Sequence, residues 1–210
     1  MKKTHLTVLV ATCLFSLKGV AAEGAALRFD KKPFISPAII KDLSTWISDS
    51  GDQVVAINLD DSHDSNRYFG EIVADPIPNG NSKTSPPYPF VHVNETCDEQ
   101  GGTGVFGYRL VGEINGVFVL HTTDGGCGSG VFHNLLLVKL EQDIGFGYSK
   151  GVLHPKVRHV VRKLIEIPIG DRYHGSIGIE NNAIVIKKDE NERDPAITND
   201  MVIKLNGYGS

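Results

Sequence analysis

Short apolar and β-branched segments, separated by glycine and asparagine turns, follow one another along most of this 210-residue chain. Such segments are predicted to be strands at 53–59, 68–74, 90–93, 104–112, 117–122, 131–140, 157–169, 176–179, 183–188 and 201–205. Parallel strands need crossover connections, usually helices, and the sequence contains only one convincing helix. The pattern therefore predicts a mainly β protein, an antiparallel sandwich or barrel of about nine or ten strands with one N-terminal helix.

The helix is predicted to begin after Ser36, which can cap it, with Pro37 in its first turn. Its apolar stripe, expected in the core, consists of Ile39, Ile40, Leu43, Trp46 and Ile47. The pair Asn115-Gly116 is the strongest hairpin signal in the chain. Segment 131–140 is almost entirely apolar, so we expect both faces of that strand to be covered.

The first 22 residues have the pattern of a secretory signal peptide. Lys2 and Lys3 precede an apolar run at 6–17, and small residues occupy the cleavage positions. This run is too short to cross a bilayer, and no later segment comes close, so no membrane span is predicted. The start of the chain is typical of bacteria. We expect residues 1–22 to be removed and 23–210 to form a single β-rich domain in the periplasm or outside the cell.

The charge of the chain argues against nucleic-acid binding. Removal of the signal peptide deletes three lysines and no acidic residue, so the formal charge changes from −4 to −7. Binding to a phosphate backbone needs clustered lysine and arginine, and the one basic run, 156–163, alternates with valine as in a strand with one solvated face. Nucleotide-binding glycine patterns and H-E-x-x-H are absent, so no cofactor is predicted.

Two cysteines, Cys97 and Cys127, remain after removal of the signal peptide. An even pair in an exported protein predicts a disulfide, and neither cysteine has the spacing of a metal pair or a C-x-x-C motif. Closing a loop of about 31 residues would stabilise the fold by about 3 to 4 kcal/mol. The glycines at 125–130 are expected to take positive φ values in a sharp corner that brings the two cysteines together.

The same corner contains a serine between two glycines, Gly128-Ser129-Gly130. A nucleophile elbow requires glycines two residues before and two after the serine, where this chain has Cys127 and Val131. A chymotrypsin-like order of histidine, aspartate and serine remains, with His63 or His92 upstream, but neither histidine has the small-residue and cysteine setting usual in such proteases.

A second catalytic candidate combines His121 with Asp124, and with His133 further on, as a general base and its orienting carboxylate. Asp124, Ser129 and His121 are therefore the candidate residues of a possible corner site. Ordinary histidines near a sheet edge and a structural corner are the simpler interpretation, and the sequence favours a protein without catalytic residues.

Asp60, Asp61 and Asp64 form the densest group of metal-capable side chains. Alternating carboxylates suit calcium, but this loop lacks the glycine and the distal glutamate of an EF-hand. The loop at 189–194 begins like a calcium loop, and Arg193 interrupts its spacing. Solvated turns explain both segments, so no metal site is predicted.

The order of motifs from Asp124 onward is a glycine-rich corner, Ser129-Gly130-Val131-Phe132, an apolar strand, Gly170-Asp171-Arg172, a hairpin, Asp194-Pro195 and a terminal strand. This order resembles exported bacterial proteins of the LppP/LprE lipoprotein type. The resemblance covers about half of the mature chain and implies a secreted β-rich domain with no transferable reaction. In that group cysteine and proline follow the Asp-Pro pair, whereas this chain has Ala196-Ile197-Thr198.

These observations together favour an exported, non-catalytic binding protein of the inhibitor or immunity type, with an envelope protein or glycan as its partner. The loops at 75–89 and 189–200 are the expected contact surfaces, because recognition residues concentrate on loops held by a rigid scaffold. A secreted hydrolase using Ser129 or a histidine and aspartate pair, and a structural envelope protein, are the alternatives.

Overall fold

The computed structural model describes residues 27, 34–45, 47, 51–62, 73–74, 90–97, 102–190 and 195–205. The predicted signal peptide, Trp46, His63, Asp64 and the loop at 75–89 lie outside the described residues. The described chain forms two helices, α1 (Pro37–Thr45) and α2 (Leu59–Ser62). Its strands are β1 (Ala56–Asn58), β2 (Val73–Ala74), β3 (Phe90–Thr96), β4 (Thr103–Ile114), β5 (Val117–Gly125), β6 (Phe132–Ser149), β7 (Val152–Asp171), β8 (Ile177–Glu180), β9 (Ala183–Ile186) and β10 (Met201–Lys204).

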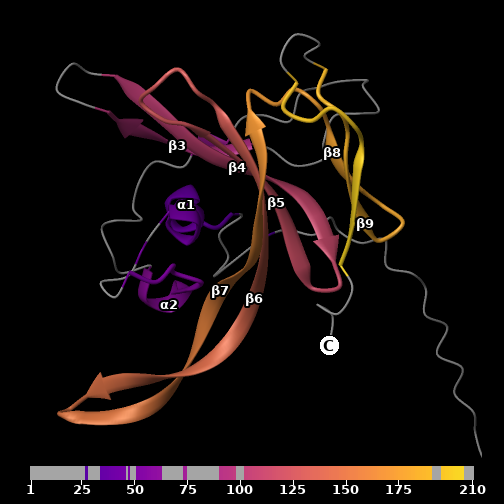
Figure 1. Cartoon of the computed structure of the whole chain (residues 1–210). Coiled ribbons are helices and arrows are strands. Elements are labelled where there is room, and N and C mark those ends of the chain that lie inside the picture. The colour runs from indigo at the N-terminus through magenta and orange to yellow at the C-terminus, as the bar shows by residue number, and fades with distance from the viewer. Residues whose placement is uncertain are drawn as a thin grey trace, which may run out of the picture.

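The strands form two antiparallel sheets. The larger sheet has seven strands in the order β1-β7-β6-β5-β4-β3-β2, and the smaller has three in the order β10-β9-β8. Figure 1 shows the large sheet as strongly curved, with α1 and α2 on one side and β8 and β9 on the other. The prediction of a mainly β, antiparallel fold with an N-terminal helix is therefore confirmed.

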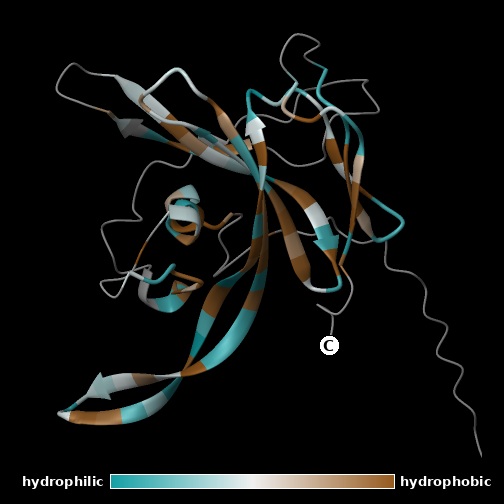
Figure 2. Ribbon diagram, viewed as in Figure 1, coloured by the Kyte–Doolittle hydropathy of each residue, from teal (hydrophilic) through white to brown (hydrophobic). Residues whose placement is uncertain are grey.

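Two apolar cores lie on opposite faces of the large sheet. In the first, Ile40 and Leu43 of α1 pack with Leu120 and Leu136 of the central strands. In the second, Leu135 and Leu137 of β6 pack with Ile184 and Ile186 of β9. The strand β6 thus contributes alternate side chains to both cores, as its apolar sequence predicts, and residues 135–138 are fully buried. Figure 2 shows apolar residues concentrated on these central strands.

Several turns form where the sequence predicts them. Asn115 and Gly116 have φ values of 53° and 77°, which lets β4 and β5 pair through a two-residue turn. Asn181 and Asn182, at 51° and 58°, join β8 to β9 in the same way. Asparagine tolerates the left-handed region better than most residues, so these turns are encoded locally.

The structure corrects three local predictions. The apolar stripe predicts Ile47 in the core, but Ile47 is 57% exposed, because α1 ends at Thr45 before the stripe is complete. The strand predicted at 53–59 is limited to β1, and Leu59 begins the short helix α2 instead. The glycines at 125–130 do not have positive φ values. At Gly130 the reason for glycine is space, since a Cβ there would lie 2.9 Å from the Phe132 ring.

The largest difference concerns the hairpin of β6 and β7. These strands have 18 and 20 residues, and they pair without a break from Val138 and Lys163 to the turn at Lys150-Gly151. No strand was predicted for residues 141–156. Figure 1 shows the far end of this hairpin reaching well beyond the helices and the other strands. Residues 144–157, called the arm below, form this projecting end.

Candidate functional site

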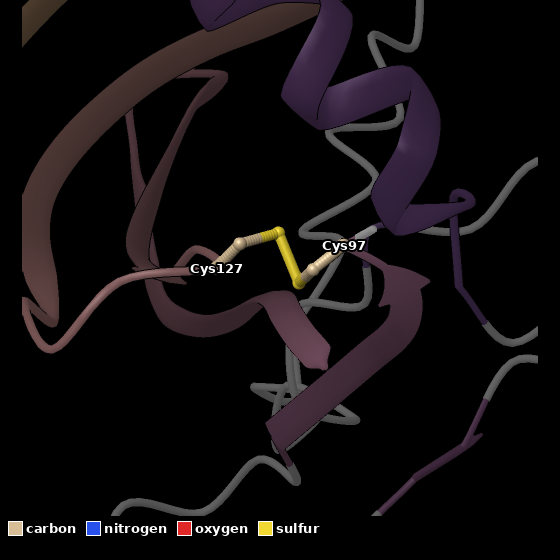
Figure 3. The surroundings of a disulfide bond; sticks show 2 residues. All are labelled: Cys97 and Cys127. Atoms are coloured by element: carbon tan, nitrogen blue, oxygen red, sulfur yellow. A yellow bond between two sulfur atoms is a disulfide. The ribbon is translucent and has the colours of Figure 1, made fainter. Parts of the chain in front are cut away.

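The predicted disulfide is present between Cys97, just after β3, and Cys127, just after β5 (Figure 3). The Cα atoms of the two residues are 5.2 Å apart. Around them the backbone is tightly packed, since a Cβ at Gly104 would lie 3.3 Å from the Cys97 sulfur. The bond joins two bends at one end of the large sheet, so this corner is held covalently.

The loop that contains Ser129 is tied to the end of β7. Arg172 donates a side-chain hydrogen bond to the carbonyl oxygen of Ser129, and the Asp171 carboxylate accepts one from the Val131 backbone over 2.7 Å. The Arg172 backbone N–H also donates to the Val131 carbonyl oxygen over 2.8 Å. These contacts use the backbone of the corner, so they account for a fixed bend rather than for an activated serine.

His121 and Asp124 do not form the predicted pair. They lie three residues apart on β5, where side chains alternate between the two faces of the sheet, so they project from opposite faces. The His121 Nε2 atom instead lies 3.0 Å from Nδ1 of His133 on the neighbouring strand β6. The structure therefore brings together His121 and His133, and it separates both from the carboxylate expected to orient them.

The two histidine rings lie against Tyr173, whose ring is edge-on to both at centroid distances of 6.2 Å. Burial, followed by the nearby His133 and Arg109, lowers the pKa of His121 to about 3. Burial also lowers the pKa of His133. A group with a pKa of about 3 is a weak base at neutral pH, so His121 is suited to packing between the two sheets.

Of the three metal candidates, only the Asp60 side chain is described by the structure. Its carboxylate accepts hydrogen bonds from the backbone N–H of His159 over 2.8 Å and from its Nδ1 atom over 3.1 Å. Burial alone would raise the pKa of Asp60, but these hydrogen bonds and the charges of His159 and Lys156 outweigh it and lower the pKa. Among the described residues no group of three metal-ligating side chains occurs. Asp60 thus caps the edge of β7.

The predicted contact loop at 189–200 is described only at 189–190 and 195–200. Asp189 is buried, and its carboxylate accepts hydrogen bonds from the backbone of His174 over 3.1 Å and of Ala196 over 3.0 Å. Lys187 and Asp200 form an exposed ion pair over 3.0 Å beside it. These contacts tie the described parts of the loop to the small sheet.

The arm carries the most exposed large apolar side chains of the described chain. Phe146 is 78% exposed, Tyr148 is 74% exposed and Ile144 is 72% exposed. These three residues alternate along β6, and their register partners on β7 are Leu153, Pro155 and Val157. Paired residues project from the same face, so the six side chains form one continuous apolar face of the arm. Exposed apolar groups that gather in this way mark interaction surfaces in soluble proteins.

The opposite face of the arm is polar and carries positive charge. Arg158 donates to Asp143 over 2.9 Å, and this hydrogen bond lowers the pKa of the Asp143 carboxyl. Toward the tip this face has glycine on β6, with His154 and Lys156 opposite on β7. A hollow of about 440 Å³ lies on this side, lined among others by Asn58, Gly145, Gly147, His154, Lys156 and Arg158.

The arm is not among the strands predicted from the sequence, although the sequence contains its signal. Residues 144–148 read Ile-Gly-Phe-Gly-Tyr, a strict alternation with period two, and no acidic residue occurs between Ile144 and Val157. The glycines, Pro155 and Lys150-Gly151 are also typical of loops. This stretch forms a hairpin because β6 pairs continuously with β7 up to the turn.

No known protein family, curated protein or solved structure matches the chain. In the part of the chain that the structure describes, neither helix has the length and apolar composition needed to cross a bilayer.

Proposed function

We propose that this chain is an exported binding protein of the inhibitor or immunity type, which acts without catalysis and engages an envelope protein through the arm. The observation that carries the proposal is the apolar face of the arm, with Ile144, Phe146 and Tyr148 all more than 70% exposed. Burying one such side chain contributes about 1.5 to 3 kcal/mol, so a partner that covers several of them gains enough to offset the cost of association.

The geometry of the candidate catalytic residues supports a non-catalytic function. His121 is held by His133 and has a pKa far below neutral pH, while Asp124 projects from the other face of β5. Ser129 lies in a bend whose contacts are made by its backbone. A serine-reactive activity probe separates the two classes, because labelling of the wild type that is lost in Ser129→Ala would favour a hydrolase.

A pull-down from periplasmic extract tests the proposal directly. The bait is the mature chain, as wild type or as the double variant Phe146→Ser and Tyr148→Ser. The matched control is Val202→Ser, which removes an apolar side chain that is 61% exposed on β10, far from the arm in the sequence. We expect a partner that the wild type and the control retain and the arm variant loses. Identical protein lists for all three baits would contradict the proposal.

A further inference from the structure

Among the described residues, no strand covers the outer edge of β6 along the arm. Within the described residues β5 pairs with β6 only between Phe132 and Val138, and the strand continues to Ser149. Backbone groups of a strand point alternately to its two sides. On β7 the N–H groups of His159 and Lys163 point away from β6, toward Asp60 and Val55.

The register with β7 then identifies the outward-pointing residues of β6. His159 pairs with Gln142, and the register continues without a shift to the tip. The backbone N–H and C=O groups of Gln142, Ile144, Phe146 and Tyr148 therefore face the open side. Within the described chain no strand pairs with this edge, so it offers a ladder for another strand.

The corresponding edge of β7 is partly blocked against strand pairing. The His159 N–H donates to the Asp60 carboxylate over 2.8 Å, so that position is capped. Pro155 is an even number of residues from His159, so its backbone faces the same side of β7, and it has no N–H that could donate to a neighbouring strand. Capped amides and proline are the usual means by which sheet proteins prevent pairing at an edge. The two edges of the arm thus differ, and within the described residues the edge of β6 has neither a cap nor a proline.

An open backbone edge favours a protein over a lipid bilayer as the occupant. In the hydrocarbon core each unsatisfied N–H or C=O group costs several kcal/mol, whereas an added strand satisfies these groups directly. The apolar face alone would suit either occupant. The four residues with outward-facing backbone groups therefore decide in favour of an extended polypeptide.

The basic side chains of β7 beside this edge indicate which polar residues an added strand would carry. A Cβ at Gly145 would lie 2.9 Å from Arg158 Nε, and a Cβ at Gly147 would lie 2.9 Å from His154 Nε2. Both β7 side chains thus extend across β6, where glycine leaves room for them. Within the described residues Arg158 Nε has no hydrogen-bond partner. Asp143 pairs with Arg158 at the inner end of this face, and no carboxylate occurs from 144 to 157. Acidic side chains of an added strand therefore complement the face nearer the tip, where Lys156 lies.

We infer that the outer edge of β6 at residues 142–148 binds an extended segment of a partner protein as an additional strand. In this segment apolar residues alternate with aspartate or glutamate. The apolar side chains continue the apolar face of the arm, and the carboxylates face Lys156, His154 and the Nε atom of Arg158. The inference rests on the proposed function, because it specifies how the arm engages its partner.

The probe is a short fluorescent peptide in which valine alternates with glutamate. The control peptide has the same sequence with lysine in place of glutamate. Fluorescence anisotropy with the full mature chain measures binding. We expect the glutamate peptide to bind at least about tenfold more tightly than the lysine peptide and to weaken as salt is added. Equal binding of the two peptides would overturn the charge assignment.

Paired substitutions distinguish the contribution of backbone hydrogen bonds at the β6 edge from the contribution of side chains on the apolar face. Ile144→Ala and Ile144→Pro both remove the apolar side chain, but only proline also removes an outward N–H. Loss of one hydrogen bond is expected to make Ile144→Pro about fivefold weaker than Ile144→Ala. At Val157, the register partner on the partly blocked edge of β7, the alanine and proline variants are expected to bind the peptide equally.

The remaining outcomes each overturn the inference. If alanine and proline are equivalent at both positions, the peptide contacts only the apolar face. If the chain sediments with phosphatidylglycerol vesicles and Ile144→Pro abolishes this binding, the occupant is a lipid surface. If the chain has twice its monomer mass by light scattering and Ile144→Pro restores the monomer, the occupant is a second copy of the chain. If neither peptide binds while the pull-down depends on Phe146 and Tyr148, the proposed function stands and strand addition is wrong.

Discussion

His121 Nε2 lies 3.0 Å from His133 Nδ1, at the point where the large sheet meets Tyr173 and the small sheet. The side chains come from neighbouring strands, β5 and β6, and share the face that β9 covers. Two protonated rings at this distance would repel each other in a buried setting. The packing of the two sheets therefore depends on a neutral pair.

Acidification is expected to begin to destabilise the protein above the pH range in which its carboxylates titrate. Burial, with the charges of His133 and Arg109, lowers the pKa of His121 to about 3, against 6.5 in the unfolded chain. The unfolded state then binds the extra proton, so stability is complete above about pH 6.5 and falls as the pH decreases toward 3. We expect a loss on the order of 2 to 4 kcal/mol, measured by urea denaturation across this range. His121→Gln should flatten the profile, and an unchanged slope would contradict this assignment.

Loss of the disulfide is expected to lower the free energy of unfolding by about 3 to 4 kcal/mol, because Cys97 and Cys127 close a long loop in the unfolded chain. Urea denaturation of the double variant Cys97→Ser and Cys127→Ser, compared with the oxidised wild type, measures this change. Dithiothreitol should reproduce the loss in the wild type and leave the double variant unaffected. Free thiols in the native protein, found by mass spectrometry, would contradict the prediction.

Truncation should destabilise the protein strongly at Leu136, in the strand covered on both faces, and hardly at all at Phe146, on the arm. Leu136 is fully buried in the first core, so Leu136→Ala is expected to cost about 2 to 5 kcal/mol. Phe146 is 78% exposed, so Phe146→Ala should change stability by less than about 0.5 kcal/mol. Thermal denaturation of both variants makes the comparison. A large cost for Phe146→Ala would mean that the arm is part of the core and not a free surface.

Asp189 is expected to be a main anchor of the polar loop that follows β9. Its buried carboxylate accepts hydrogen bonds from the backbone of His174 and Ala196, so Asp189→Ala should cost about 2 to 3 kcal/mol. Asp200→Asn is the matched control, because Asp200 is an exposed carboxylate in the same loop and its pair with Lys187 is screened by solvent. Chemical denaturation should place the control much closer to the wild type. The reverse order would exclude this role for Asp189.

Local signals made much of the fold predictable. Asn115-Gly116 and Asn181-Asn182 adopt left-handed conformations that asparagine and glycine favour, so their hairpins form where the sequence indicates. The apolar run at 131–140 correctly indicates a strand covered on both faces, because each face must bury its own side chains. The end of α1 was less predictable, since Ile47 continues the apolar period but lies beyond the last turn.

The arm was not predictable in the same way, because it does not contribute to a core. Among the described residues, none covers its apolar face. Gly145, Gly147 and Pro155 indicate a loop when each is considered alone, and the hairpin depends on pairing with a strand whose register begins in the core. The candidate pair of His121 and Asp124 failed for a simpler reason. An odd separation within a strand places two side chains on opposite faces.

The unequal edges of the arm also set a limit on assembly. If a partner strand pairs with β6, Pro155 and the Asp60 cap on the other side would hinder a second strand from pairing with β7 in the same register. The arm is therefore suited to one added strand. Strand addition at the arm would then end after one partner strand instead of continuing into a stacked fibril.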